Sequence, residues 1–182
     1  MNTPARYSGI AIALHWLIAL AVVSAFTLGI YMHDLPLSPH KLKLYSYHKW
    51  IGITVLGLML ARIGWRISHI PPPPLEMPEW QRSAVQAVHL GLYLLLLVVP
   101  LSGWLMSSAL GFKVVWMGLV PLPDLIAKNK ELGEILKEVH KSLDFVLLGL
   151  LTVHIAAALK HHFVDRDGTL QRMLPSFSRK SQ

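Results

Sequence analysis

The sequence predicts an all-α integral membrane protein whose helices pack as a four-helix bundle. Hydrophobic residues make up 53% of the 182 residues, and they gather in long uncharged runs rather than in the patterns of a soluble core. Most basic residues, tyrosines and tryptophans flank these runs, as they do at membrane interfaces. A chain of this length makes one domain, so we expect a single membrane domain over residues 1–182.

Four segments have the length and composition of membrane spans. The first, residues 8–32, and the third, residues 83–110, contain no formally charged side chain, as expected for a helix in hydrocarbon. The second, residues 48–67, has a short uncharged centre, but the long basic side chains at its ends can reach the interface. The fourth, residues 139–163, is almost wholly apolar over most of its length.

Prolines mark several connections and one span. Pro36 and Pro39 predict a loop over residues 33–47, because proline breaks a helix interior. Four consecutive prolines, residues 71–74, form a stiff link that ends the second span. Pro100 lies inside the third span and predicts a kink there.

A longer polar loop is predicted between the third and fourth spans, over residues 112–138. Its last part, KNKELGEILKE at residues 128–138, alternates charged and apolar residues in the manner of a short amphipathic helix at the surface. We therefore expect this helix to be separate from the fourth span.

Composition excludes several functions. The chain has no cysteine, which excludes thioether-attached haem, cysteine-ligated iron–sulfur clusters and disulfides. Its formal charge of +7 comes from basic residues that flank apolar spans instead of forming a stripe, so we expect no nucleic-acid partner. Membrane lipid is the expected surrounding.

Four spans place both termini on one side of the membrane, which we call the terminal side. That side carries nine basic residues: Arg6, Arg62, Arg66, Arg82, Lys160, Arg166, Arg172, Arg179 and Lys180. The opposite side carries eight: Lys41, Lys43, Lys49, Lys113, Lys128, Lys130, Lys137 and Lys141. The small excess favours both termini in the cytoplasm of a bacterial inner membrane, although the charge count alone hardly decides the orientation.

Two histidines of the fourth span suggest two metal centres. His140 and His154 are fourteen residues apart, so both rings leave one face of a helix, about 21 Å apart along its axis. A polar ring in hydrocarbon is costly and usually functional. Each ring therefore needs a partner at its own depth.

Alternating helix direction supplies these partners. His15 lies about two turns inside the first span and shares the inner level with His154. His48 opens the second span at the opposite surface and shares the outer level with His140. Two facing imidazoles are natural axial ligands of a b-type haem, whereas zinc usually needs four ligands, with carboxylates or thiols that we do not expect in this interior. Such a pair leaves no open axial position, so the expected chemistry is electron transfer.

Further residues are weaker candidates. His89 shares the inner level, and we expect it to bond to a haem propionate or to a neighbouring helix rather than to the iron. Arg62 and Arg66 suit carboxylate capture, although their commoner role is contact with lipid headgroups. Gly52 lies one turn after His48, where its small size can serve either a flat cofactor ring or helix packing.

The outer side carries several lysines that can attract a small anion. Lys41, Lys49 and Lys113, with Lys43 and Lys141, lie in or next to loops on the side opposite the termini. They can form a positive funnel. Acidic residues in the same loops reduce the net positive charge there.

Taken together, these motifs resemble the bacterial cytochrome b561 family of small four-span, di-haem membrane proteins. The resemblance covers nearly the whole chain. It rests on HWL from His15, HKWIG from His48, His140, VHIAAALKHHF over residues 153–163 and GTLQRMLP over residues 168–175. The combination is specific, although no single motif is.

The resemblance implies two haem b groups. The family's inner ligands match His15 and His154, and its outer ligands match His48 and His140. His161, which lies nearly on the ligand face, matches a histidine in the family's quinone region; an interfacial histidine without this role is the alternative.

The resemblance also implies an activity. The most similar members resemble superoxide oxidases, in which two superoxide ions reduce one ubiquinone, with uptake of two protons, to give two molecules of O₂ and a quinol. The implied partners are therefore ubiquinone and superoxide or another one-electron donor.

Two other functions remain open at this point. The chain can be a haem-containing anchor that relays electrons for a partner dehydrogenase or hydrogenase. It can also be a transporter of a metal or haem, although we expect the spans to lack carboxylates that could form a path. The sequence does not fix the oligomeric state.

Overall fold

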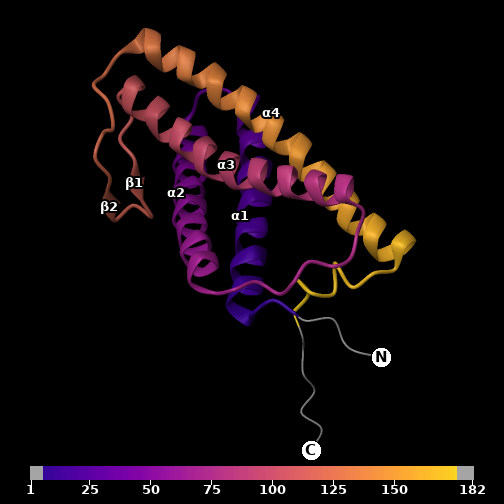
Figure 1. Ribbon diagram of the computed structural model, residues 1–182. Helices are drawn as coiled ribbons and strands as arrows, with labels where there is room; N and C mark the ends of the chain where they lie inside the picture. Colours follow the sequence, from indigo (N-terminus) through magenta and orange to yellow (C-terminus); the bar gives the residue numbers. More distant parts are fainter. Residues whose placement is uncertain (1–5, 176–182) are drawn as a thin grey trace, which may run out of the picture.

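The computed structural model describes residues 6–175, and Arg179 and Lys180 of the charge count lie outside this part. Its described residues form four long helices, α1 (Gly9–His33), α2 (Pro39–Ser68), α3 (Glu79–Leu110) and α4 (Lys130–Lys160). All four are long and apolar enough to cross a membrane. Figure 1 shows that the described chain begins and ends at the same end of the molecule. The predicted all-α four-helix membrane fold is confirmed.

Helix α2 begins at Pro39, inside the segment predicted as a loop over residues 33–47. This prediction was wrong because it treated Pro39 as a helix breaker. Proline lacks an amide hydrogen, but the first turn of a helix has no partner for that hydrogen, so proline fits there well. The Ser38 side chain caps this turn by accepting a hydrogen bond from the Lys41 amide.

Helix α4 also begins earlier than its span. Asn129 caps it by accepting a hydrogen bond from the Leu132 amide, and the helix then runs without a break through His140 and His154 to Lys160. The separate amphipathic helix predicted over residues 128–138 is therefore wrong. Residues 130–138 instead form the first turns of α4, and the apolar part of the same helix follows them.

The connection between α3 and α4 contains a small hairpin that the sequence did not predict. Strands β1 (Val115–Trp116) and β2 (Val120–Pro121) pair antiparallel. Trp50 of α2 donates from its indole to the Val115 carbonyl over 2.6 Å, and Trp116 donates to Thr54 Oγ1. The hairpin is thus fastened to the outer end of α2.

The helices form two antiparallel pairs, α1 with α2 and α3 with α4, joined through a contact between α2 and α3. In Figure 1 the α3–α4 pair runs obliquely across the α1–α2 pair. Among the described residues, no Cα of α4 comes within 8 Å of a Cα of α1 or α2. Directly packed helices have axes only about 8–10 Å apart, so α4 stands away from α1 and α2 and can contact them only through side chains.

The protein interior is small. In each of the four helices, no more than 17% of the residues in the apolar 18-residue stretch are buried inside the protein. Many large apolar side chains are therefore exposed on its surface. This distribution suits a helix bundle in lipid, where no water must be excluded. A compact core remains at the centre of the bundle, formed by Ile18, Val22, Val55, Met59, Leu92, Leu96, Val99 and Leu147.

Gly52 lies at the contact between α2 and α3. A side chain added at Gly52 would have its first carbon 3.9 Å from Cβ of Pro100. Helix α3 runs continuously through Pro100. Gly52 thus faces α3 at an ordinary contact distance.

The segment after α4 fastens the terminal end of the molecule. Trp16 donates from its indole to the Met173 carbonyl over 2.8 Å, and the buried Arg172 donates to the carbonyl of Pro73 over 2.7 Å. These contacts join α1, the proline stretch and the C-terminal segment. The GTLQRMLP motif thus has a structural role at this end.

Replacing Leu147 by alanine should lower the free energy of unfolding by about 2 kcal/mol or more, because Leu147 is only 3% exposed and its loss leaves a cavity. The measurement is thermal unfolding of the purified, cofactor-loaded protein in detergent. Leu148→Ala is the matched control, since Leu148 is 44% exposed on the same helix. Equal losses for both variants would contradict this packing.

Candidate functional site

The outer level brings His48 of α2 and His140 of α4 together. Their ring centres lie 6.4 Å apart, and the ring planes are nearly perpendicular. Nδ1 of His48 donates to the Ala25 carbonyl of α1 over 3.1 Å. Nδ1 of His140 lies 2.8 Å from Ser102 Oγ and 3.1 Å from the Val99 carbonyl of α3. Each ring is thus held by a helix adjacent to its own.

These hydrogen bonds define which nitrogen of each ring is left for a ligand. The Ala25 and Val99 carbonyls can only accept, and the Ser102 hydroxyl itself donates to the Val99 carbonyl over 2.7 Å. The hydrogen of both imidazoles therefore lies on Nδ1, and Nε2 keeps its lone pair. Histidines that bind metals are usually oriented in this way, by a hydrogen bond from the other ring nitrogen.

The spacing of the rings fits a shared metal. An imidazole nitrogen binds a metal at about 2.0–2.1 Å, so two rings on opposite sides of one ion have centres roughly 6 Å apart. The observed 6.4 Å agrees with this arrangement. The residues present therefore fit a metal ion that the two imidazoles would hold between them.

Two glycines allow the rings to lie close to neighbouring helices. A Cβ at Gly103 of α3 would lie 3.1 Å from Cε1 of His140, and one at Gly29 of α1 would lie 3.6 Å from Cε1 of His48. The first distance is too short for an unstrained contact. A side chain at Gly103 would therefore require the His140 ring to move by a few tenths of an ångström.

A carboxylate lies beside the outer pair, contrary to the prediction that this interior would offer none. Oδ2 of Asp144 is 3.6 Å from Nε2 of His140, and the Asp144 side chain is about one-third exposed. Because Asp144 follows His140 by one helical turn, it lies on the same face of α4. Asp144 thus places a carboxyl group next to the outer pair.

The inner level brings three histidines together. The ring centres of His15 and His154 lie 6.2 Å apart, close to the spacing of the outer pair. His89 of α3 also lies near His154, with ring centres 5.4 Å apart. The predicted pair is therefore adjacent in space, and His89 is a neighbour of it, as its depth in the sequence predicted.

Arginines surround a cavity at the terminal end, next to this inner level. Arg62 donates to the Tyr93 hydroxyl and to the Ala11 carbonyl, both over 3.1 Å, and lies close enough to His15 and His154 to interact electrostatically. The cavity, about 680 Å³ in volume, is lined by residues that include Arg6, Arg62 and Arg66. No acidic side chain is among its described lining residues, so it favours an anionic group.

His161 occupies a buried position just beyond α4, in the π-helical turn η1 (His161–Asp165). Its Nδ1 lies 2.6 Å from Asp167 Oδ2 and 3.2 Å from Asp165 Oδ2. Its Nε2 lies 3.1 Å from the side-chain nitrogen of Gln81 at the start of α3. His161 is therefore held on both ring nitrogens.

Asp167 remains a carboxylate in this arrangement. Burial alone would raise the pKa of Asp167, but hydrogen bonds from Thr169 and from His161 hold the pKa below its usual value. Asp165, in contrast, is bound by Lys160 Nζ over 2.7 and 2.9 Å. The ligand atoms of His161, Asp165 and Asp167 lie within 4.8 Å of one another, but the Lys160 ammonium already neutralises one of the two carboxylates.

The lysines of the predicted anion funnel do not form one group. Lys49 donates to the Lys113 carbonyl over 3.0 Å, which brings these two residues together near the hairpin. Lys41 donates instead to the carbonyls of His33 and Leu35, in the connection between α1 and α2. The ammonium of Lys41 is therefore engaged in holding that loop.

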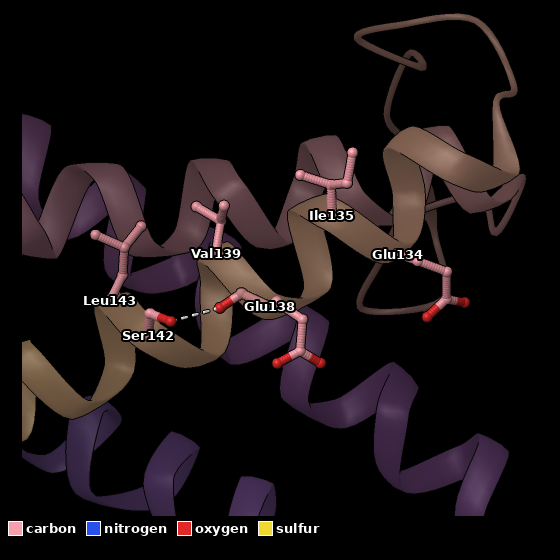
Figure 2. A pocket seen from close by; sticks show the side chains of 6 residues that line it. All are labelled: Glu134, Ile135, Glu138, Val139, Ser142 and Leu143. Carbon is pink, nitrogen blue, oxygen red and sulfur yellow. Dashed lines mark hydrogen bonds between the residues drawn. The ribbon is translucent and has the colours of Figure 1, made fainter.

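A shallow groove of about 540 Å³ follows the outer end of α4 (Figure 2). Its lining residues, which include Ile135, Val139 and Leu143, all belong to α4 itself. Among residues 6–175, no side chain from a second element lines it, and Glu134 and Glu138 lie beside the apolar side chains. The groove is thus one face of a single helix rather than a converging site.

Four apolar helices, with facing histidines at two depths and a cationic cavity near the inner one, define a membrane protein of the haem-binding, electron-transfer class. The comparison with known proteins supports this class directly. Residues 6–176 match the family model described as prokaryotic cytochrome b561. The chain belongs to the prokaryotic cytochrome b561 family, and it is a membrane electron-transfer protein for which b-type haem binding is expected.

Individual relatives cover nearly the whole chain. Cytochrome b561 homolog 2 of Escherichia coli strain K12 is 38% identical over 95% of this chain and 93% of the relative. Cytochrome b561 homolog 1 of the same strain is 32% identical over 93% and 97%. The probable superoxide oxidase CybB of Yersinia pestis is 31% identical over 93% and 96%.

Several residues of the site were not found from the sequence. Ser102 and the Ala25 carbonyl orient the outer rings, and Asp167 and Gln81 hold His161. The small residues of α3 and the aspartate soon after the HHF motif were visible in the sequence. Their partners lie on other helices, so spacing along one helix could not reveal the contacts.

Replacing Gly103 by valine should push the His140 ring out of place, at a cost of about 1–3 kcal/mol for the added side chain. The haem content of the purified protein should fall. Gly149→Val is the matched control, because a Cβ at Gly149 meets nothing within 4 Å. Equal haem content in both variants would contradict the observed contact.

Proposed function

We propose that the chain is a di-haem b cytochrome that takes single electrons from superoxide at its outer side and reduces ubiquinone near its terminal end. His48 and His140 would hold the outer haem, and His15 and His154 the inner one. The observation that carries this proposal is the pair of histidine contacts at two levels, with ring centres 6.4 and 6.2 Å apart. When bound, each haem accepts and releases one electron at a time.

The spacing between the two levels supports electron transfer across the membrane. His140 and His154 lie on one continuous helix, about 21 Å apart along its axis. The outer pair lies towards the hairpin, and the inner pair lies towards the chain termini. A donor on one side and a quinone near the other side would thus have separate sites.

The choice of superoxide and ubiquinone is supported by one of the relatives. The Yersinia pestis relative is described as a probable superoxide oxidase. Lys49 and Lys113, which meet near the hairpin, would attract a small anion to the outer side, and Lys41 would add charge at the neighbouring loop. His161 would contact the quinone.

The cationic cavity would accommodate the propionates of the inner haem. Arg62 and Arg66 both line it, and arginine binds carboxylates through paired N–H donors. Arg62 is oriented by Tyr93, whereas Arg66 is exposed. His89 lies next to the inner pair and would add a hydrogen bond rather than a bond to iron.

The proposed location is the bacterial inner membrane, with both termini in the cytoplasm. The common position of the two described chain ends supports the shared side (Figure 1). In this orientation the hairpin and the outer histidine pair face the periplasm. Superoxide formed outside the cell would then reach the outer side directly.

The test is stopped-flow mixing of the purified chain with superoxide and a soluble ubiquinone. The proposal predicts rapid reduction of the haems by superoxide and their reoxidation by quinone without another protein. Haems that superoxide does not reduce would exclude this donor. Quinone reduction that occurs only with an added dehydrogenase or hydrogenase would instead favour an anchor subunit.

Replacing His140 or His48 by alanine should remove the outer haem and leave the inner haem, because each outer ligand belongs to one pair only. Haem per polypeptide should fall by about half, and the inner haem spectrum should remain. His162→Ala is the control, since His162 belongs to neither pair. Retention of the full haem content in both ligand variants would exclude the assignment.

A further inference from the structure

His161 lies in a setting that the haem sites do not explain. It is only 6% exposed, it belongs to a π-helical turn, and both of its ring nitrogens have side-chain partners. π-helical turns are rare and occur frequently at functional sites. The two partners come from different parts of the chain, the start of α3 and the segment after α4.

The partner of Nδ1 has a fixed chemical role. Asp167 Oδ2 lies 2.6 Å from Nδ1, and a carboxylate can only accept, so the hydrogen lies on Nδ1. Asp167 is itself held, because its Oδ1 accepts the Thr169 amide over 2.9 Å. The low pKa of Asp167 agrees with a carboxylate that stays charged.

Gln81, the partner of Nε2, can form a hydrogen bond with either protonation state of the His161 ring. Gln81 faces Nε2 at 3.1 Å, and an amide carries both a donor and an acceptor. Its NH₂ group can donate to a bare Nε2, and after rotation its oxygen can accept from a protonated Nε2. A quinone carbonyl and a quinol hydroxyl offer the same two roles. The hydrogen bonds that Gln81 can make with Nε2 are therefore of the same kind as those that a quinone oxygen would make.

We propose that Asp167 is a positioning residue that keeps the hydrogen of His161 on Nδ1, so that Nε2 becomes the atom that gives protons to the quinone. This inference rests on the proposed function and specifies how its quinone site handles protons. Asp167 acts through His161 and does not touch the substrate. The arrangement resembles the carboxylate that orients the catalytic histidine of serine proteases.

The proton step balances as follows. The imidazolium form of His161 carries hydrogens on both nitrogens, and Asp167 stabilises its positive charge. For each electron that the bound haems would supply to the quinone, one Nε2–H bond would break and one O–H bond would form on a quinone oxygen. His161 would then be neutral, with its remaining hydrogen on Nδ1, and it would regain a proton at Nε2 from a hydronium ion of the solvent before the second transfer.

The other charged groups near the ring do not replace Asp167. Asp165 lies 3.2 Å from Nδ1, but its carboxylate is bound by Lys160. The contact from α3 is made by Gln81, which is uncharged. Two carboxylates contact the ring among its described contacts, and Lys160 binds that of Asp165. The carboxylate of Asp167 is thus the one whose negative charge Lys160 does not offset.

The test compares Asp167→Asn with Asp165→Asn in the haem-loaded protein. An asparagine at position 167 keeps the oxygen that accepts from Thr169, but it presents an NH₂ group to Nδ1 and so favours the wrong tautomer. Reoxidation of reduced haems by a soluble ubiquinone should slow by about tenfold or more. The dependence of this rate on pH should also change, because the carboxylate that faces Nδ1 is lost.

The control readouts separate this role from a structural one. Haem content and the rate of haem reduction by the donor should not change in Asp167→Asn. Asp165→Asn should have a much smaller effect on quinone reduction. An unchanged rate and pH profile in Asp167→Asn, or an equal loss in Asp165→Asn, would overturn the inference.

A measurement on the unmodified protein keeps the inference testable if the variant fails to fold. The ¹⁵N chemical shifts of His161, assigned by comparison with His161→Gln, should show the neutral ring protonated on Nδ1 at high pH. Protonation on Nε2 would overturn the inference alone. If quinone fails to reoxidise the haems of the unmodified protein, the proposed function fails and this inference fails with it.

Discussion

The hydrogen bonds from Nδ1 of the outer histidines to backbone carbonyls are the interactions on which the rest of the site depends. A histidine ring within a membrane bundle must satisfy its N–H group, because hydrocarbon offers no partner. The carbonyls of Ala25 and Val99 meet this need from α1 and α3. As a result, Nε2 of His48 and Nε2 of His140 keep their lone pairs, and the two rings lie with their centres 6.4 Å apart. The same hydrogen bonds couple helix packing to the position of the rings.

The spacing of α4 from α1 and α2 is a second constraint on the site. If α4 packed directly on these helices, no flat group could lie between the paired histidines. Instead α4 packs on α3, and among the described residues its Cα atoms remain more than 8 Å from those of α1 and α2. The connections hold this arrangement at both ends. The hairpin is fastened to α2 on the outer side, and the C-terminal segment joins α1 and the proline stretch on the other.

The sequence predicted the features that depend on one helix at a time. Hydrophobic length predicted the four spans, and the fourteen-residue spacing of His140 and His154 predicted two levels on one face of α4. Helix direction then predicted the partners His15 and His48, which the structure places beside them. The ligation of iron by these residues remains a proposal.

Features that depend on local exceptions or on distant partners could not be predicted in this way. Pro39 starts a helix because it occupies the first turn, and α4 continues through its polar beginning because Asn129 caps it earlier. Asp144 was overlooked because it lies within an otherwise apolar span. The role of Asp167 depends on a turn that brings it back to His161, a contact that helical periodicity cannot show.

The central claim is that one polypeptide holds two irons, each between two imidazoles on different helices. Its most direct measurement is the haem b content per polypeptide of the purified protein, together with near-infrared magnetic circular dichroism to identify the axial ligands. The account predicts two low-spin haems per chain, both with two histidine ligands. A single haem per chain, or a haem with an axial ligand other than histidine, would contradict it.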